Sequence, residues 1–160
     1  MGKAIAVTSG KGGTGKSTVS VGLALAYAAS QKRVLLIDMD EGLRCLDLML
    51  GIDAQLIFDL SDALSGRDWL DSVYSVPDEP MLRLIPAPDK LGAIEHDAFG
   101  GFLREVLSKS TLIRFLDSFN TRGAVSWFLF MVLVSSLLSH SYGHRIRSSC
   151  KRELQDRGQR

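Results

Sequence analysis

A glycine-rich stretch near the N-terminus holds two lysines and a serine at a spacing that suits phosphate binding. Residues 10–17 read GKGGTGKS, which fits the pattern G-x-x-x-x-G-K-[ST]. The inner glycines let backbone N–H groups turn towards an anion with no side chain in the way. Lys16 would then reach the β- and γ-phosphates of a nucleotide, and the Ser17 hydroxyl is placed to bind Mg²⁺. The alternative is a glycine-rich turn that binds no ligand.

The surrounding residues predict a strand before this stretch and a helix after it. Residues 3–8 (KAIAVT) and 33–38 (RVLLID) are short apolar runs typical of buried strands, and residues 16–30 carry apolar side chains at helical spacing. Such a strand–helix–strand unit predicts parallel strands, with the positive end of the helix dipole at the phosphate. The predicted nucleotide contacts are Gly10, Lys11, Gly12, Gly13, Thr14, Gly15, Lys16, Ser17 and Thr18.

Two carboxylates stand at the end of the second predicted strand: Asp38 is its last residue and Asp40 follows two positions later. Ligands of open parallel sheets bind at the carboxyl ends of the strands, so we expect both residues beside the glycine-rich stretch. Side chains two positions apart on an extended segment face the same way, so both could reach one site. The alternative is a solvated acidic turn.

The first lysine of the stretch makes the pattern more specific. The residues KGG-x-GK-[ST] at 11–17 resemble the deviant Walker A motif of the MinD/ParA family of ATPases. The following D-x-D-x-G-L-R-x-L-D pattern, residues 38–47, is most similar to the MinD branch of that family, with Cys45 in place of a common asparagine. The resemblance covers about residues 3–109. It implies an α/β fold of the three-layer P-loop NTPase type, a parallel sheet with helices on both faces, truncated or altered after residue 109.

The resemblance also implies a function. Members of the MinD branch bind ATP with Mg²⁺, hydrolyse it and take part in division-septum site selection. Lys11 would cross to the partner's nucleotide in a homodimer formed on ATP binding; a solvated loop lysine is the alternative. Lys11, Lys16 and Asp40, the last as the residue that orients the attacking water, are the candidate catalytic residues. Ser17 and Asp38 are the candidate metal ligands.

Further partners follow from the same resemblance. It implies Min-system partner proteins and association with the inner membrane surface, although no family-type C-terminal membrane helix is recognisable. The net charge of +1 gives no argument for nucleic acid. Cys45 and Cys150 are typical of reduced thiols, and the N-terminus does not read as a signal peptide. We therefore expect a cytoplasmic protein, with a peripheral location at the inner face of the cell membrane as the variant.

The rest of the resembling region reads as alternating helices and strands. Apolar residues at helical spacing predict helices over residues 43–51, 56–66 and 96–109. Residues 81–87 (MLRLIPA) predict a third strand. Residues 1–109 are therefore expected to form a nucleotide-binding domain.

The composition changes after residue 109. Residues 1–109 carry 11 Lys and Arg against 15 Asp and Glu, whereas residues 110–160 carry 8 against 3. Residues 110–160 are therefore expected to be a divergent tail. The family's Walker B aspartate is not recognisable there: Asp117 is a candidate, and an incidental aspartate is the favoured reading. ATP hydrolysis is thus left open, with a truncated non-catalytic nucleotide-binding remnant, or a ParA-like DNA-partition ATPase, as alternative functions.

One long apolar run lies in that tail, at residues 124–138. Three interpretations remain: a buried strand or helix, an exposed aggregation-prone segment, or a membrane span, for which the run is short. His140 and His144 stand at helical i, i+4 spacing, but Gly143 between them and the lack of a third ligand argue against a metal site.

Overall fold

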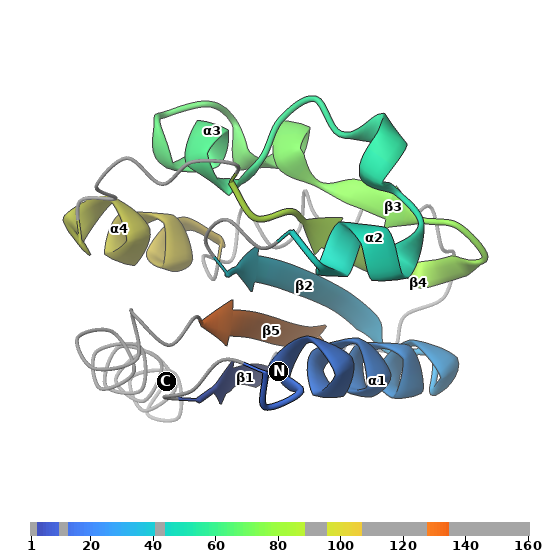
Figure 1. Cartoon of the computed structure of the whole chain (residues 1–160). Helices are drawn as coiled ribbons and strands as arrows, with labels where there is room; N and C mark the ends of the chain where they lie inside the picture. Colours follow the sequence, from blue (N-terminus) through green and yellow to red (C-terminus); the bar gives the residue numbers. More distant parts are fainter. Residues whose placement is uncertain (1–2, 10–12, 41–43, 89–95, 107–127, 135–160) are drawn as a thin grey trace, which may run out of the picture.

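The computed structural model describes residues 3–9, 13–40, 44–88, 96–106 and 128–134 (Figure 1). These residues build a five-stranded sheet in the order β1-β5-β2-β4-β3. The strands are β1 (Lys3–Thr8), β2 (Arg33–Met39), β3 (Tyr74–Val76), β4 (Glu79–Ile85) and β5 (Phe128–Val134). All neighbours pair in parallel except β3, which is antiparallel to β4.

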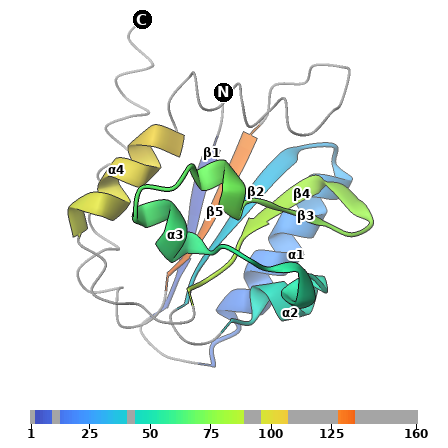
Figure 2. The ribbon, with the colours of Figure 1, turned by 90° about the horizontal axis from the view of Figure 1, so that it is seen from above.

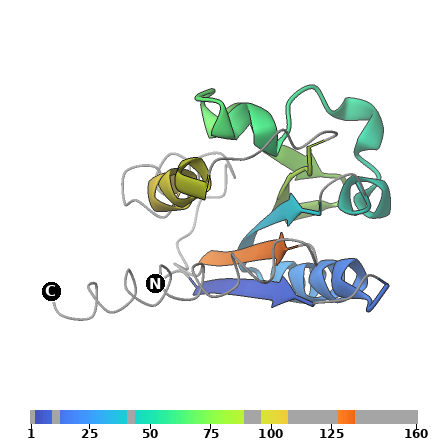
Figure 3. The ribbon, with the colours of Figure 1, turned by 60° about the vertical axis from the view of Figure 1, so that its left-hand side comes forward.

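Helices lie on both faces of this sheet. They are α1 (Lys16–Ala29), α2 (Leu46–Leu50), α3 (Leu60–Leu64) and α4 (His96–Val106), with 3₁₀ turns η1 (Asp53–Gln55) and η2 (Trp69–Ser72). Figures 2 and 3 both show α1 and α2 on one side of the strands and α3 and α4 on the other. The predicted three-layer α/β architecture is therefore present in the described residues.

Successive buried side chains of the strands lie on opposite faces of the sheet, as expected for strands covered on both sides. On one face, residues of α1 and α2 form a buried cluster with β2 and β4. Its members are Val21, Ala24, Ala28, Val34, Leu36, Leu46, Ile52, Val76, Leu82 and Leu84. The alternate residues Leu35 and Ile37 are also fully buried, on the face of α3 and α4. There, Trp69 meets Phe102 of α4 edge to face, with ring centroids 6.5 Å apart.

The strand from the long apolar run lies inside the sheet. β5 pairs in parallel with β1 on one side and β2 on the other, and Val134 is in register with Thr8 and with Met39. Of the interpretations of residues 124–138, a strand is thus confirmed for Phe128–Val134. This strand comes from the segment expected to be a divergent tail, so the sheet does not end at residue 109. The domain boundary at that residue stays a prediction.

Two predicted helices are shorter than their apolar spacing suggests. The helix predicted over residues 43–51 is α2, which spans only Leu46–Leu50. The second is the helix that became α3. Residues 56–66 were expected to be helical, but α3 begins at Leu60. The Tyr74 hydroxyl accepts hydrogen bonds from the backbone N–H groups of Ile57 at 2.9 Å and Phe58 at 2.8 Å, which keeps them out of a helix. Asp59 then caps α3 with a capping box. The apolar spacing of residues 56–66 could not predict this contact, because Tyr74 belongs to the distant strand β3.

Strand β3 was not predicted from the sequence. Its three residues are too few for a periodic signal, although Pro77 and Asp78, with Asp78 at φ 60°, mark the turn into β4. Among the described residues, no helix is long and apolar enough to cross a membrane. Lys11, Asp117, His140 and His144 lie outside the described residues.

Candidate functional site

The described part of the glycine-rich stretch joins β1 to α1. Gly10, Lys11 and Gly12 are outside the described residues, whereas residues 13–15 form the turn that enters the helix. Gly13 and Gly15 have φ values of +72° and +82°, in the left-handed region that favours glycine. The Ser9 and Thr14 hydroxyls lie 2.7 Å apart and bridge the stretch. The glycine-rich stretch therefore lies between a strand and a helix, as predicted, and its phosphate binding stays a prediction.

The start of α1 has the features of a helix terminus that can bind an anion. Gly15 is its N-cap and has no side chain that could cap the helix, whose first turn holds no acidic residue. Backbone N–H groups at a helix start carry partial positive charge, so an acceptor is favoured there. Lys16, the first helical residue, is only 9% exposed. Ser17 is half-buried and Thr18 is exposed.

Among the described residues, nothing fills the side-chain positions of the two glycines. A Cβ added at Gly13 or Gly15 would meet no described atom within 4 Å. Space above two glycines, at the positive end of a helix and beside a lysine, suits a phosphate group.

The two carboxylates at the end of β2, Asp38 within the strand and Asp40 just beyond it, lie at the same edge of the sheet. Thr8, Val134 and Met39 form one row across β1, β5 and β2. The strand that bears Asp38 is therefore next but one to the strand before the phosphate loop, about 10 Å away at the usual strand spacing. The expectation that Asp38 and Asp40 emerge near the loop is consistent with this register, with β5 intervening.

The two carboxylates have different surroundings. Asp38 is 1% exposed, and its Oδ1 accepts the backbone N–H of Asp40 at 2.9 Å. Asp40 lies beyond the end of β2 and is half-buried. Burial raises the pKa of the Asp38 carboxyl from 3.8 to about 7, and the charges of Asp40 and Asp47 add to the rise. Hydrogen bonds from the backbone of Asp40 and Leu46 act in the opposite direction.

These residues fit a nucleotide with Mg²⁺ better than a metal held by protein alone. Within the described ranges, no three His, Cys, Asp or Glu side chains gather as a metal site. Mg²⁺ in nucleotide sites is commonly held by one or two protein oxygens, with phosphate oxygens and water completing the shell. The Asp38 carboxylate and the Ser17 hydroxyl are oxygen donors of the required kind.

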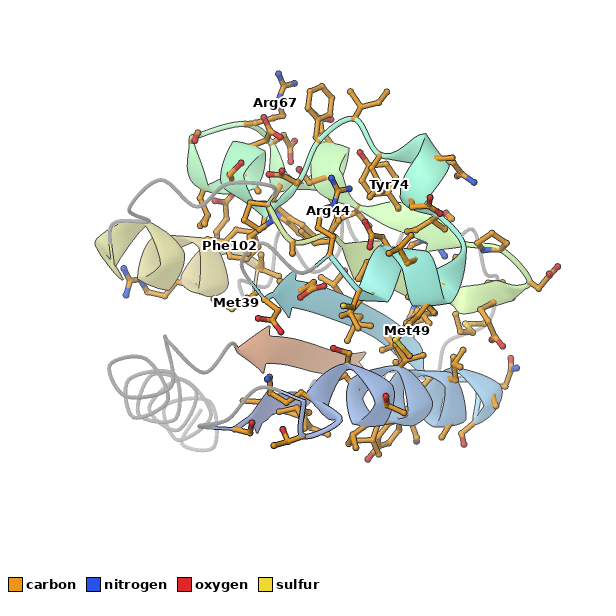
Figure 4. The ribbon with its side chains drawn as sticks, viewed as in Figure 1. Met39, Arg44, Met49, Arg67, Tyr74 and Phe102 are labelled. Carbon is orange, nitrogen blue, oxygen red and sulfur yellow. The ribbon has the colours of Figure 1, made fainter. Side chains whose placement is uncertain are left out.

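Sequence reasoning did not assign a role to the last acidic residue of the 38–47 pattern. Asp47, in the first turn of α2, is 3% exposed. Its Oδ2 accepts a hydrogen bond from Arg44 Nε at 3.0 Å, and its Oδ1 accepts one from Leu48 N at 2.9 Å. Figure 4 shows Arg44 just before α2. The signal was present in the sequence, because Arg44 and Asp47 are an i, i+3 pair of opposite charge.

Comparisons with known proteins agree with this arrangement. The septum site-determining protein MinD of Bacillus subtilis is 52% identical over 67 residues, which cover 42% of this chain and 25% of that protein. MinD of Synechocystis is 44% identical over 89 residues, which cover 54% of this chain and 33% of the other. The alignments thus span a quarter to a third of these relatives.

Solved structures are similar over more of the chain. The MinC:MinD cell division protein complex of Aquifex aeolicus matches with a TM-score of 0.59 and 29% identity, over 82% of this chain and 48% of that one. MinD of Pyrococcus horikoshii OT3, complexed with Mg-ADP, matches with a TM-score of 0.52 and 27% identity, over 81% and 48%. The family model of the CobQ/CobB/MinD/ParA nucleotide binding domain matches residues 5–154. The chain therefore belongs to the CobQ/CobB/MinD/ParA family of nucleotide-binding domains.

Proposed function

We propose that this chain binds ATP with Mg²⁺ and acts as a MinD-like ATPase domain in placing the division septum. The observation that carries the proposal is the turn at Gly13 and Gly15, with its left-handed backbone, leading directly into the uncapped start of α1 at the buried Lys16. A relative solved with Mg-ADP supports the choice of ligand.

The proposed roles of the loop, Lys16 and the oxygen ligands rest on their chemistry, and those of Asp40 and Lys11 rest on the family resemblance. The loop from Gly10 to Thr18 cradles the phosphates with its N–H groups, and Lys16 neutralises their charge. The Ser17 hydroxyl and the Asp38 carboxylate hold the Mg²⁺ side of the nucleotide, and Asp40 orients the attacking water. Lys11 would contact the nucleotide of a second copy, in a homodimer that forms when ATP binds.

Partners belong to the same proposal. The similar structure from Aquifex aeolicus is a complex of MinD with MinC. We infer that this chain also meets Min-system proteins and works in the cytoplasm, at the inner surface of the membrane when it associates with one.

The deciding experiment compares the melting temperature of the protein alone, with ATP, and with ATP and Mg²⁺. A ligand that binds only the folded state stabilises it by about 2.7 kcal/mol at a concentration 100 times its Kd. The Lys16→Ala variant should lose this response, while Lys11→Ala should keep it and fail to form the ATP-dependent dimer in light scattering. A wild-type melting temperature that ATP and Mg²⁺ leave unchanged would refute the proposal.

A second candidate is nucleotide binding without hydrolysis. It is favoured by β5, which stands between β1 and β2 and has the sequence FLFMVLV, without an acidic residue. A strand between β1 and β2 could place a further carboxylate at the site. The residues of β5, Phe128–Val134, include no Asp or Glu, so β5 supplies no carboxylate. Phosphate release over many turnovers, compared with the Asp40→Asn variant, separates the two candidates.

A further inference from the structure

The ion pair after β2, between the buried Asp47 and the partly exposed Arg44, is not used by the function proposed above. Asp47 has a side chain only 4% exposed, and that of Arg44 is 27% exposed, with Nε and Oδ2 3.0 Å apart. A carboxylate taken out of water is costly unless it is paired and hydrogen-bonded. Both Asp47 oxygens have donors, one from Arg44 and one from the backbone of Leu48. This pair therefore holds Asp47 in one orientation at the start of α2.

The start of α2 is also tied to Asp38. The N-cap of α2, Cys45, makes no side-chain capping bond. Instead, the backbone of Leu46, the first helical residue, hydrogen-bonds the Asp38 carboxylate, which also accepts the N–H of Asp40. The buried Asp38 carboxylate is thus hydrogen-bonded to the backbone of both Asp40 and Leu46. Leu46 is adjacent to Asp47, so whatever fixes Asp47 also fixes the Leu46 amide.

We propose that Asp47 is a positioning residue for the metal side of the nucleotide site: paired with Arg44, it holds the start of α2 so that the Leu46 N–H orients the Asp38 carboxylate. The inference rests on the proposed function for its consequence, because it assigns Asp38 to Mg²⁺. The geometry itself, a brace from Arg44 through Asp47 to the Leu46 amide, can be measured without nucleotide.

A purely structural role for Asp47 makes a different prediction. If the ion pair only stabilises the fold, its loss should lower stability and leave the contribution of Mg²⁺ to ATP affinity unchanged. If it positions Asp38, its loss should reduce that contribution and spare the affinity for ATP without metal, which depends on the phosphate loop. The ratio of the ATP dissociation constants without and with Mg²⁺ therefore distinguishes the two roles: it stays unchanged for a structural role and falls for a positioning role.

The experiment uses the full chain and three variants. Asp47→Asn keeps the shape of the side chain and removes its charge, and Arg44→Lys keeps the charge and removes the Nε donor. Asp71→Asn is the matched control, since it breaks the i, i+4 pair Arg67–Asp71, which is exposed and has N and O 3.5 Å apart. NMR measures the rate of amide hydrogen exchange at Leu46, which reports on the hydrogen bond of that amide. Calorimetric titration measures the ATP dissociation constant without and with Mg²⁺, which reports on the nucleotide site.

We expect Asp47→Asn to speed Leu46 exchange by about tenfold or more, the size of one lost charge-assisted hydrogen bond. We expect the Mg²⁺ ratio to fall at least about fivefold, with Arg44→Lys intermediate and Asp71→Asn at the wild-type value. Should Asp47→Asn fail to fold, Arg44→Lys gives the same two readouts. Wild-type exchange at Leu46 or a wild-type Mg²⁺ ratio in folded Asp47→Asn, or in Arg44→Lys as its substitute, overturns the inference alone. A wild-type protein whose ATP affinity ignores Mg²⁺ overturns the proposed function.

Discussion

The Asp38 carboxylate, near the end of β2, accepts the backbone N–H of Asp40 at 2.9 Å, so the acidic residue in the strand holds the backbone of the one just beyond it. Asp38 is 1% exposed, whereas Asp40 is half-buried beyond the end of the strand. Two carboxylates that look alike in the sequence therefore differ in their access to water. This difference favours separate roles, with Asp38 as the fixed ligand and Asp40 as the group that meets a water molecule.

The raised pKa of Asp38 predicts how stability depends on pH. The folded-state pKa is about 7 and the ordinary value is 3.8. Between these values the folded protein holds a proton that the unfolded chain has released, so the free energy of unfolding falls as pH rises. The slope from this group approaches about 1.4 kcal/mol per pH unit inside the window and vanishes outside it.

Asp38→Asn isolates that contribution, because the asparagine does not titrate. Urea unfolding from pH 4 to pH 8 should give a wild-type stability that declines relative to the variant as pH rises. Parallel stability curves for the two proteins would contradict the assignment.

The left-handed backbone of Gly15 predicts a pair of opposite mutational effects on α1. Gly15→Ala should destabilise the protein by about 1–2 kcal/mol, because an L-residue is strained at φ +82°. Gly22→Ala, inside α1 with no described atom within 4 Å of its new Cβ, should stabilise by about 1 kcal/mol. Denaturant unfolding measures both; equal signs would mean that the loop relaxes away from the left-handed conformation.

Lys16 should contribute to ligand affinity more than to folding. Removing a cation that donates charge-assisted hydrogen bonds to phosphate is expected to weaken ATP binding about 10- to 100-fold. Lys32, beyond the other end of α1, provides the control, and Lys32→Ala should bind ATP as the wild type does. Titration calorimetry with ATP and Mg²⁺ checks both variants. An affinity of Lys16→Ala equal to that of Lys32→Ala would remove Lys16 from the site.

The Tyr74 hydroxyl should control the segment before α3. It accepts the N–H groups of Ile57 and Phe58 and lies 3.0 Å from the Phe58 carbonyl oxygen, to which it donates. Tyr74→Phe should cost about 1–3 kcal/mol of stability, since it leaves these backbone groups without that partner. Hydrogen exchange should accelerate at Ile57 and Phe58 and remain unchanged at Leu36 in β2. Unchanged exchange at the first two residues would show that water replaces the hydroxyl.

Local patterns in the sequence were sufficient for the phosphate loop and its flanking elements. β1 and α1 begin where the apolar runs predicted, because a strand, a glycine turn and a helix that are contiguous depend on nearby residues. β2 also begins where it was predicted, whereas the strand predicted over residues 81–87 lies two residues earlier, as β4 (Glu79–Ile85). The glycines, Lys16 and Ser17 could be named without any tertiary information, since the motif is continuous.

Only the tertiary structure decided the arrangement between distant segments. The sequence determined that residues 124–138 are apolar, but a strand, a helix and a membrane segment share that property. Pairing with both β1 and β2 selects the strand, because its backbone N–H and C=O groups then find partners on either side. In the same way, the burial of Asp38 and its bond to Leu46 depend on how α2 packs beside β2, a contact between residues that no local spacing specifies.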